Sequence, residues 1–318
     1  MITAGLRRAI GAAAGRQDAD PLLRPGPVPG SYTSSLPFRL DPGDPGKTAA
    51  RLAARLGDEL WIASAEVTGP GFLTVTVTYA TLARLAIRIT NAGSACAESD
   101  ALAGRTVPAP RPAAVTDWPQ ARAALAAELT ARLAAAAGAV IDPERTSVPA
   151  PPSPPPGPVA ETIRYAGPDA VRFALARMPP GGRPPEAAVV ARHVLANPAY
   201  AVRYAHAAAA AVLRWAAALE IRPAGFEPRL LAEPGELALL DTLSWLPERV
   251  AVAARRGRPD DFAGYLAELA ARTIDTMSTT SFRKIPGISS ERLWLADAAR
   301  TGLAAGLGLL GIAAPPRL

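Results

Sequence analysis

The chain has 318 residues, of which 49% are hydrophobic and 19% are charged. The length predicts about two domains, and the composition excludes a wholly disordered protein. Basic residues outnumber acidic ones by 34 to 28, for a net charge of +6, and all but two of the basic residues are arginines. A GC-rich genome favours arginine, alanine and proline codons, so this charge is weak evidence for an anionic partner.

Cysteine and histidine are too scarce for several classes of site. Cys96 is the only cysteine, which excludes an intrachain disulfide and a cysteine zinc site. His193 and His206 are the only histidines, so we expect neither a metal nor a cofactor. No apolar run approaches the ~20 residues of a membrane span, and the N-terminus is a poor signal peptide. We therefore expect a soluble cytoplasmic protein that does not contact a membrane.

The first part of the chain mixes helical and strand patterns. We predict a helix over 2–13, a Gly- and Pro-rich loop over 24–47, and a helix over 48–56 that ends at Gly57. Two β-branched segments, 61–68 and 72–78, are joined by Gly-Pro-Gly, which is strong turn chemistry. A helix through Leu82, Leu85 and Ile89 follows. Residues 1–92 are therefore predicted to form a small α+β domain.

The middle of the chain is predicted to be a linker over residues 93–160. It contains one helix, which Thr116 or Asp117 can cap and Gly138 can end. Eight prolines crowd into 143–158, where neither a helix nor a central strand can form.

Residues 161–318 read as helices with short connections, which predicts a mostly α-helical bundle. The expected segments are 169–178, 185–196, a long helix from Asn197-Pro198, one from Glu233-Pro234 that Pro247 breaks, one capped by Asp260, and one capped by Ser290. The fold class is therefore α+β: a small α+β domain followed by a helical bundle.

Two polar patterns could bind a ligand. Two neighbouring stripes of the long helix carry Arg203, Tyr204 and His206. One interpretation is a polar stripe that binds a phosphate or a base. The other is a tyrosine pair in the core with a half-buried histidine. Arg283 and Lys284 follow four hydroxyl residues, 278–281, in a polar loop, which suits phosphate contact but also fits a solvated loop. Residues 43–48 resemble a phosphate loop, yet Asp41 stands where that loop needs its first glycine.

Several segments together resemble the arginyl-tRNA synthetase family. The strongest is 197–207 (NPAYAVRYAHA), which is similar to the family's N-P-x-x-Y-V-Q-Y-A-H-A signature; 167–173 (GPDAVRF) is similar to a stretch that follows its catalytic core. Residues 230–318 resemble its helical anticodon-binding domain, called DALR. Residues 67–73 (VTGPGFL) resemble its N-terminal domain, which contacts the tRNA elbow.

None of the segments that resemble the family corresponds to its catalytic domain. In the family that domain carries an H-I-G-H-type motif and a K-M-S-K-S-type loop. Only the linker 93–160 stands in its place, and it contains no histidine or lysine. Other positions also depart from the family: Thr74 replaces an asparagine, and 273–278 lacks the aromatic residues of the penultimate helix. The resemblance therefore implies a protein that is not an enzyme.

The resemblance implies a non-catalytic tRNA-binding protein, with regulation as its role and tRNA-Arg or a similar tRNA as its partner. We expect residues 1–92 to contact the tRNA elbow and 161–318 the anticodon arm, in a monomer without a cofactor. The expected contact residues are Phe72, Thr74, Arg203, Tyr204, His206, Arg283, Lys284 and Arg317. The alternative is a protein-interaction module that keeps the fold but binds a protein, such as the true synthetase.

Overall fold

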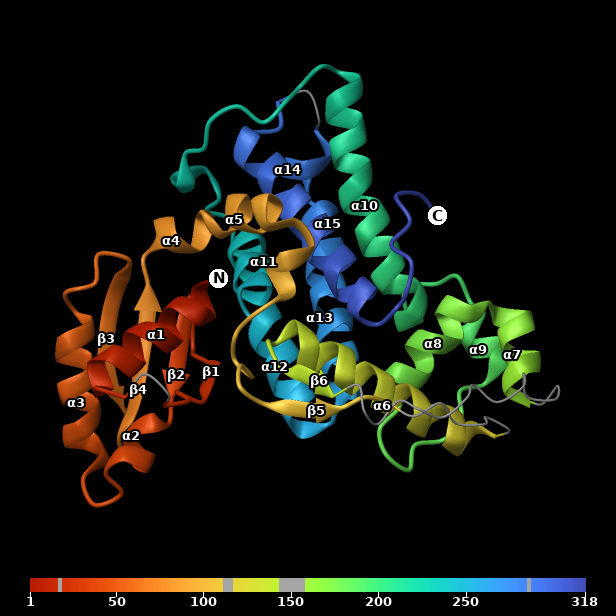
Figure 1. Ribbon diagram of the computed structural model, residues 1–318. Coiled ribbons are helices and arrows are strands. Elements are labelled where there is room, and N and C mark those ends of the chain that lie inside the picture. Colours follow the sequence, from red (N-terminus) through yellow and green to blue (C-terminus); the bar gives the residue numbers. More distant parts are fainter. Residues whose placement is uncertain (17–18, 111–116, 143–157, 285–286) are drawn as a thin grey trace.

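The computed structural model describes residues 1–16, 19–110, 117–142, 158–284 and 287–318 (Figure 1). The N-terminal region contains α1 (Ile2–Ala14), β1 (Leu23–Pro25), β2 (Ser31–Ser34), α2 (Leu36–Leu40), α3 (Pro45–Leu56), β3 (Ile62–Thr68), β4 (Phe72–Val77), α4 (Tyr79–Ala83) and α5 (Leu85–Ala92). The four strands form an antiparallel sheet in the order β1-β2-β4-β3. Helix α3 packs on β3 and β4, and α1 packs on α3.

The predicted hairpin is confirmed, but the predicted loop over 24–47 is wrong. That segment contributes β1, β2 and α2, and β2 pairs with β4 along its whole length. Residues 31–34 (SYTS) carry a weak strand signal, so pairing and burial decide their conformation: Tyr32 and Ser34 are fully buried. Residues 43–48, which resemble a phosphate loop, run into the first turn of α3, where the Asp44 carboxylate at the N-cap accepts a hydrogen bond from Lys47 N–H.

The middle of the chain contains more than the predicted single helix. A 3-10 helix, η1 (Gly93–Ala97), is followed by β5 (Thr106–Pro108), α6 (Trp118–Ala136) and β6 (Val140–Asp142). Strands β5 and β6 are parallel, so the segment makes one short βαβ unit. Of the two predicted caps of α6, Asp117 is the one at the N-cap position. The Pro-rich prediction over 143–158 lies outside the described residues except at Pro158, which begins α7.

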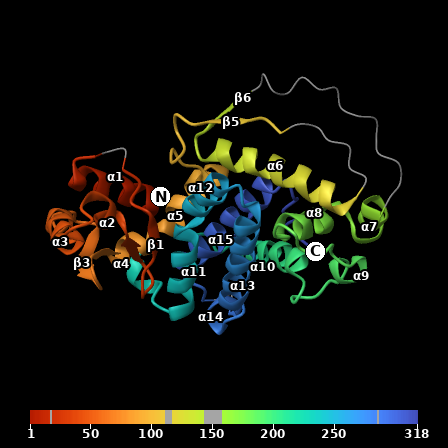
Figure 2. The ribbon, with the colours of Figure 1, turned by 90° about the horizontal axis from the view of Figure 1, so that it is seen from below.

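The remaining elements are helical, as predicted. They are α7 (Pro158–Ala166), α8 (Pro168–Arg177), α9 (Ala187–Val190), α10 (Pro198–Ala218), η3 (Pro228–Leu230), α11 (Pro234–Ser244), α12 (Leu246–Arg256), α13 (Pro259–Met277), α14 (Thr280–Arg283) and α15 (Ser290–Leu309). Figure 2 shows the N-terminal region on one side of the bundle and α7 and α9 on the other.

Three helix predictions need correction. The helix expected over 185–196 is reduced to α9, because a turn occupies the residues before Asn197. Arg258 rather than Asp260 stands at the N-cap of α13, and Asp260 instead pairs with the Arg258 guanidinium. The cap of α15 is Ser289, one residue before the expected Ser290.

An ionic cluster joins the N-terminal region to the bundle. The Arg7 guanidinium on α1 contacts the Glu248 carboxylate on α12 at 2.5 Å and Asp20 at 2.9 Å. Arg255 on α12 also pairs with Asp20. Glu248 is 5% exposed, so its charge depends on Arg7 for compensation.

Hydrogen bonds and a ring contact hold the same boundary. The buried Tyr32 hydroxyl donates to the Ser244 hydroxyl at 2.7 Å, and its ring lies 5.1 Å from that of Trp245. Gly30 N–H donates to the Asp241 carboxylate at 2.8 Å. The N-terminal region is thus fixed directly to α11 and α12. Helices α5 and η1, on either side of residue 92, both pack against α15. The predicted domain boundaries at residues 92 and 160 stay predictions.

Replacing Arg7 tests this boundary. We expect Arg7→Met to lower the free energy of unfolding by about 3 kcal/mol, because Glu248 is left buried without its partner. Glu248→Gln in that background should recover part of the loss. Arg256→Met, which breaks only an exposed 3.9 Å pair with Asp261, should cost less than about 1 kcal/mol. Urea unfolding of the wild type and the three variants measures these effects, and equal losses from the two arginine substitutions would contradict the assignment.

Candidate nucleic-acid interface

Helix α10 begins at a turn that Asn197 builds. Its side-chain oxygen accepts from Ala199 N–H at 3.2 Å, which caps the helix as predicted. Its amide nitrogen donates to the carbonyls of Val190 and Arg192. Pro198 occupies the first turn, where no N–H is needed. The buried Asn197 therefore holds the residues before α10 against its first turn.

Three rings form an aromatic row at the start of α10. His193, in the turn, lies 5.4 Å from Tyr200 with the rings 12° apart, and Tyr200 lies 5.8 Å from Tyr204. Tyr204 is 37% exposed and His193 is exposed. The tyrosine pair is therefore not part of the core, and the row offers partly exposed faces to a ligand. The sequence could not place His193 in this row, because only the turn brings it over Tyr200.

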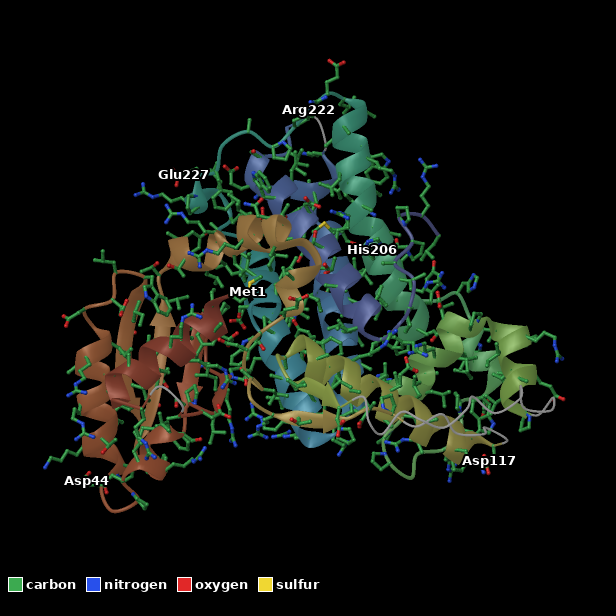
Figure 3. All side chains as sticks on the ribbon, in the orientation of Figure 1. Met1, Asp44, Asp117, His206, Arg222 and Glu227 are labelled. Atoms are coloured by element: carbon green, nitrogen blue, oxygen red, sulfur yellow. The ribbon has the colours of Figure 1, made fainter. Side chains whose placement is uncertain are left out.

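His206 lies inside the bundle, only 4% exposed. Its Nδ1 donates to the Pro315 carbonyl at 2.9 Å, which requires the proton on Nδ1. Figure 3 shows the residue beside the C-terminal segment. The structure thus supports the interpretation of a buried histidine bonded to the backbone, and His206 offers no exposed ring to a base.

Other side chains hold the C-terminal segment, residues 310–318, against α8 and α10. The Arg214 guanidinium donates to the Pro316 carbonyl, and Arg172 donates to the Leu310 carbonyl. Ala313 N–H donates to the Asp169 carboxylate. These contacts leave Arg317 exposed beside α10.

Arg203 is neither fully exposed, as a ligand-binding stripe would predict, nor fully buried, as a core position would predict. Its side chain is half-buried, and its Nε has no hydrogen-bond partner within the part of the chain that the structure describes.

Sequence reasoning missed Arg214 and Trp215 further along α10. Trp215 is 55% exposed, and the spacing of 11 residues from Tyr204 on one helix is the signal that could have found it.

The second predicted basic site lies on a different element. Arg283 ends α14, Lys284 follows it, and both side chains are exposed. Helix α14 is placed by Ser281, whose hydroxyl bonds to Glu233 at the start of α11, and by the buried Phe282. Arg283 and Lys284 therefore form a separate basic site rather than an extension of the aromatic row.

The two residues predicted for the N-terminal region differ in access. Phe72 is half-buried with its ring 4.8 Å from that of Phe38. Thr74 is 7% exposed, and its hydroxyl lies within hydrogen-bond distance of Thr33 and Thr68 in the neighbouring strands. Thr74 therefore stabilises the sheet and does not present its hydroxyl to a partner.

No group of three metal-ligating side chains is found among the described residues. Within the same residues, no helix is long and apolar enough to cross a membrane. Cys96 is buried, and burial raises the pKa of its thiol to about 12, which makes it a poor nucleophile.

The environment of His206 predicts a pH effect. Burial lowers its pKa, the Pro315 carbonyl opposes this, and the Arg300 charge lowers it further, so the net shift is downward. Below the ordinary histidine pKa the unfolded state binds the extra proton, and the folded protein loses stability as the pH falls. Between about pH 8 and pH 5 the wild type should lose more unfolding free energy than His206→Gln. Parallel pH profiles of the two proteins, measured by urea unfolding, would contradict this.

Comparison with known proteins identifies a domain in the chain. Residues 202–318 match the family model of the DALR anticodon binding domain. The chain is 37% identical over 164 residues to the arginine–tRNA ligase of Clavibacter sepedonicus and 37% identical over 166 residues to that of Renibacterium salmoninarum. Each match covers 50% of this chain and 30% of the relative, so the aligned region spans less than a third of those enzymes.

The fold is similar to a solved structure of Thermus thermophilus arginyl-tRNA synthetase. The TM-score is 0.68 at 14% identity, and the match covers 100% of both chains. The chain therefore carries a DALR anticodon binding domain and is related to arginine–tRNA ligases over half of its length.

Proposed function

We propose that the protein binds tRNA without aminoacylating it, with tRNA-Arg or a similar tRNA as the partner. The observation that carries this is the aromatic row at the start of α10, which lies beside Arg203 and the C-terminal segment. The DALR match begins at residue 202, within the same helix. Aromatic faces stack on unpaired bases such as those of an anticodon loop, and arginines neutralise the neighbouring phosphates.

The roles of the predicted residues follow from their positions. Tyr204 would stack on a base, with Tyr200 and His193 behind it. Arg203 and Arg317 would contact phosphates, and His206 would act indirectly by holding Pro315 and so placing Arg317.

Two further surfaces would contact the tRNA away from the aromatic row. Arg283 and Lys284 would contact phosphates elsewhere on the arm, and Phe72 would contact the elbow.

We infer that the chain performs no adenylation. Parallel pairing within the described residues is confined to β5 and β6, which have three residues each. The synthetase resemblance requires histidine and lysine motifs around ATP, and the two lysines of the sequence, Lys47 and Lys284, lie outside residues 93–160. A regulatory role in sensing or sequestering tRNA fits a binding protein of this kind.

Binding is tested by mobility shift with tRNA at low salt. We expect Tyr204→Ala to weaken binding by about tenfold, because stacking contributes about 1–3 kcal/mol per base. Tyr165→Ala is the matched control, since Tyr165 is 69% exposed on α7 outside the row. The wild-type affinity should fall steeply with salt. A failure to shift any tRNA, or binding that ignores salt, would refute the proposal.

Catalysis is tested separately by ATP–pyrophosphate exchange with arginine and tRNA present. We expect no exchange above the level without protein, because residues 93–160 offer neither a histidine nor a lysine to bind the ATP phosphates. An active arginyl-tRNA synthetase serves as the positive control. Measurable arginine-dependent exchange would overturn the non-catalytic assignment.

One observation favours the alternative of a protein-interaction module. Trp215 and Leu219 lie one helical turn apart at the end of α10 and are 55% and 52% exposed. Such an apolar pair suits a protein partner such as the true synthetase. Co-purification of a protein without RNA, abolished by Trp215→Ala but not by Tyr204→Ala, would favour this function.

A further inference from the structure

A cavity lies between the N-terminal region and the bundle, away from the aromatic row. Its volume is about 530 Å³, and it is lined on one side by the β1 segment 22–25 and on the other by α12 and the residue before it. From that second side come Trp245, Glu248, Arg249, Val252, Arg255 and Arg256. Pockets of this size hold small molecules.

The lining is strongly basic. Arg24, Arg249, Arg255 and Arg256 line the cavity, whereas Glu248 is its only carboxylate lining residue within the described chain. That carboxylate is already neutralised by Arg7, and Asp20 offsets Arg255 from outside the lining. The contact of Arg256 with Asp261 is long, at 3.9 Å, so most of the Arg256 charge is uncompensated. An anion in the cavity would therefore be attracted by Arg24, Arg249 and Arg256.

Three N–H donors of the lining residues lack acceptors. Trp245 Nε1, Arg249 Nε and Arg255 Nε are buried without a hydrogen-bond partner anywhere in the described ranges. Trp245 is 3% exposed, and the Arg249 guanidinium is held 5.8 Å from the centre of its ring. Buried donors are normally paired, so unpaired ones beside a cavity mark a place for an acceptor.

We propose that this cavity binds a small phosphorylated anion, of the size of pyrophosphate or a nucleotide. Phosphate oxygens would accept from Arg249, Arg255 and Trp245, while Arg24 and Arg256 at the exposed rim would attract the charge. The unpaired donors lie below the surface, so the ligand must enter the cavity, which favours a small molecule over a polynucleotide.

Such a ligand would act on the boundary described above. It would contact β1 and α12 together, and a ligand that binds only the folded, joined form stabilises that form. The site is distinct from the proposed tRNA surface on α10, so the cavity would give the protein a second input: a phosphorylated metabolite that controls how firmly the two regions are joined.

Calorimetric titration tests the proposal with inorganic phosphate, pyrophosphate and ATP as separate probes, on the full chain without tRNA. We expect pyrophosphate or ATP to bind and to raise the melting temperature. The double variant Arg24→Ala/Arg256→Ala should weaken binding at least tenfold. The control Arg51→Ala/Arg84→Ala removes the same charge from exposed arginines outside the cavity and should change affinity less than twofold.

A second variant separates binding from folding. Trp245→Phe keeps the ring beside Tyr32 but removes the indole N–H, so it should weaken ligand binding while circular dichroism stays that of the wild type. Absence of binding by every probe, or equal losses in the two double variants, would overturn the proposal. The Arg24→Ala/Arg256→Ala protein should still shift tRNA; if it loses both activities together, the cavity and the tRNA surface are not separate sites.

Discussion

The structure depends on the direct contact between the N-terminal region and helices α11 and α12. Glu248 is buried there and compensated by Arg7, which comes from the first helix of the chain, more than 200 residues away in sequence. A buried charge is tolerated only with a partner, so α1 must lie against α12. The bonds from Tyr32 and Gly30 extend the same contact to the sheet. The N-terminal region is therefore held in a fixed position relative to α11 and α12, which lie within the DALR match.

Within the bundle, small residues decide how closely the helices approach. A Cβ at Gly306 of α15 would lie 2.3 Å from Leu266 of α13, and one at Gly302 would lie 2.9 Å from Leu243 of α11. These glycines let the leucines of the neighbouring helices pack onto the backbone of α15. The alanines of α10 do the same on its buried face, where Ala205 and Ala209 are fully buried. This close packing places α10 and leaves its aromatic row at the surface.

The candidate site was only partly accessible from sequence. The 3.6-residue period placed Tyr200 and Tyr204 together, and both lie in one row. The period could not show that His206 turns inward to Pro315 or that Thr74 is enclosed between Thr33 and Thr68, because those partners are distant in sequence. The cavity beside α12 gave no local signal either, since β1 and α12 contribute its two sides.

The sequence by itself determined the elements with strong local chemistry: the Gly-Pro-Gly hairpin, the Asn197-Pro198 and Glu233-Pro234 helix starts, and the break at Pro247. Each of these acts through its own backbone or its nearest neighbours. Only the tertiary structure decided that residues 31–34 form a strand, that β5 and β6 pair in parallel, and which arginines are exposed. These features depend on partners far along the chain, and pairing and burial overrode their weak local preferences.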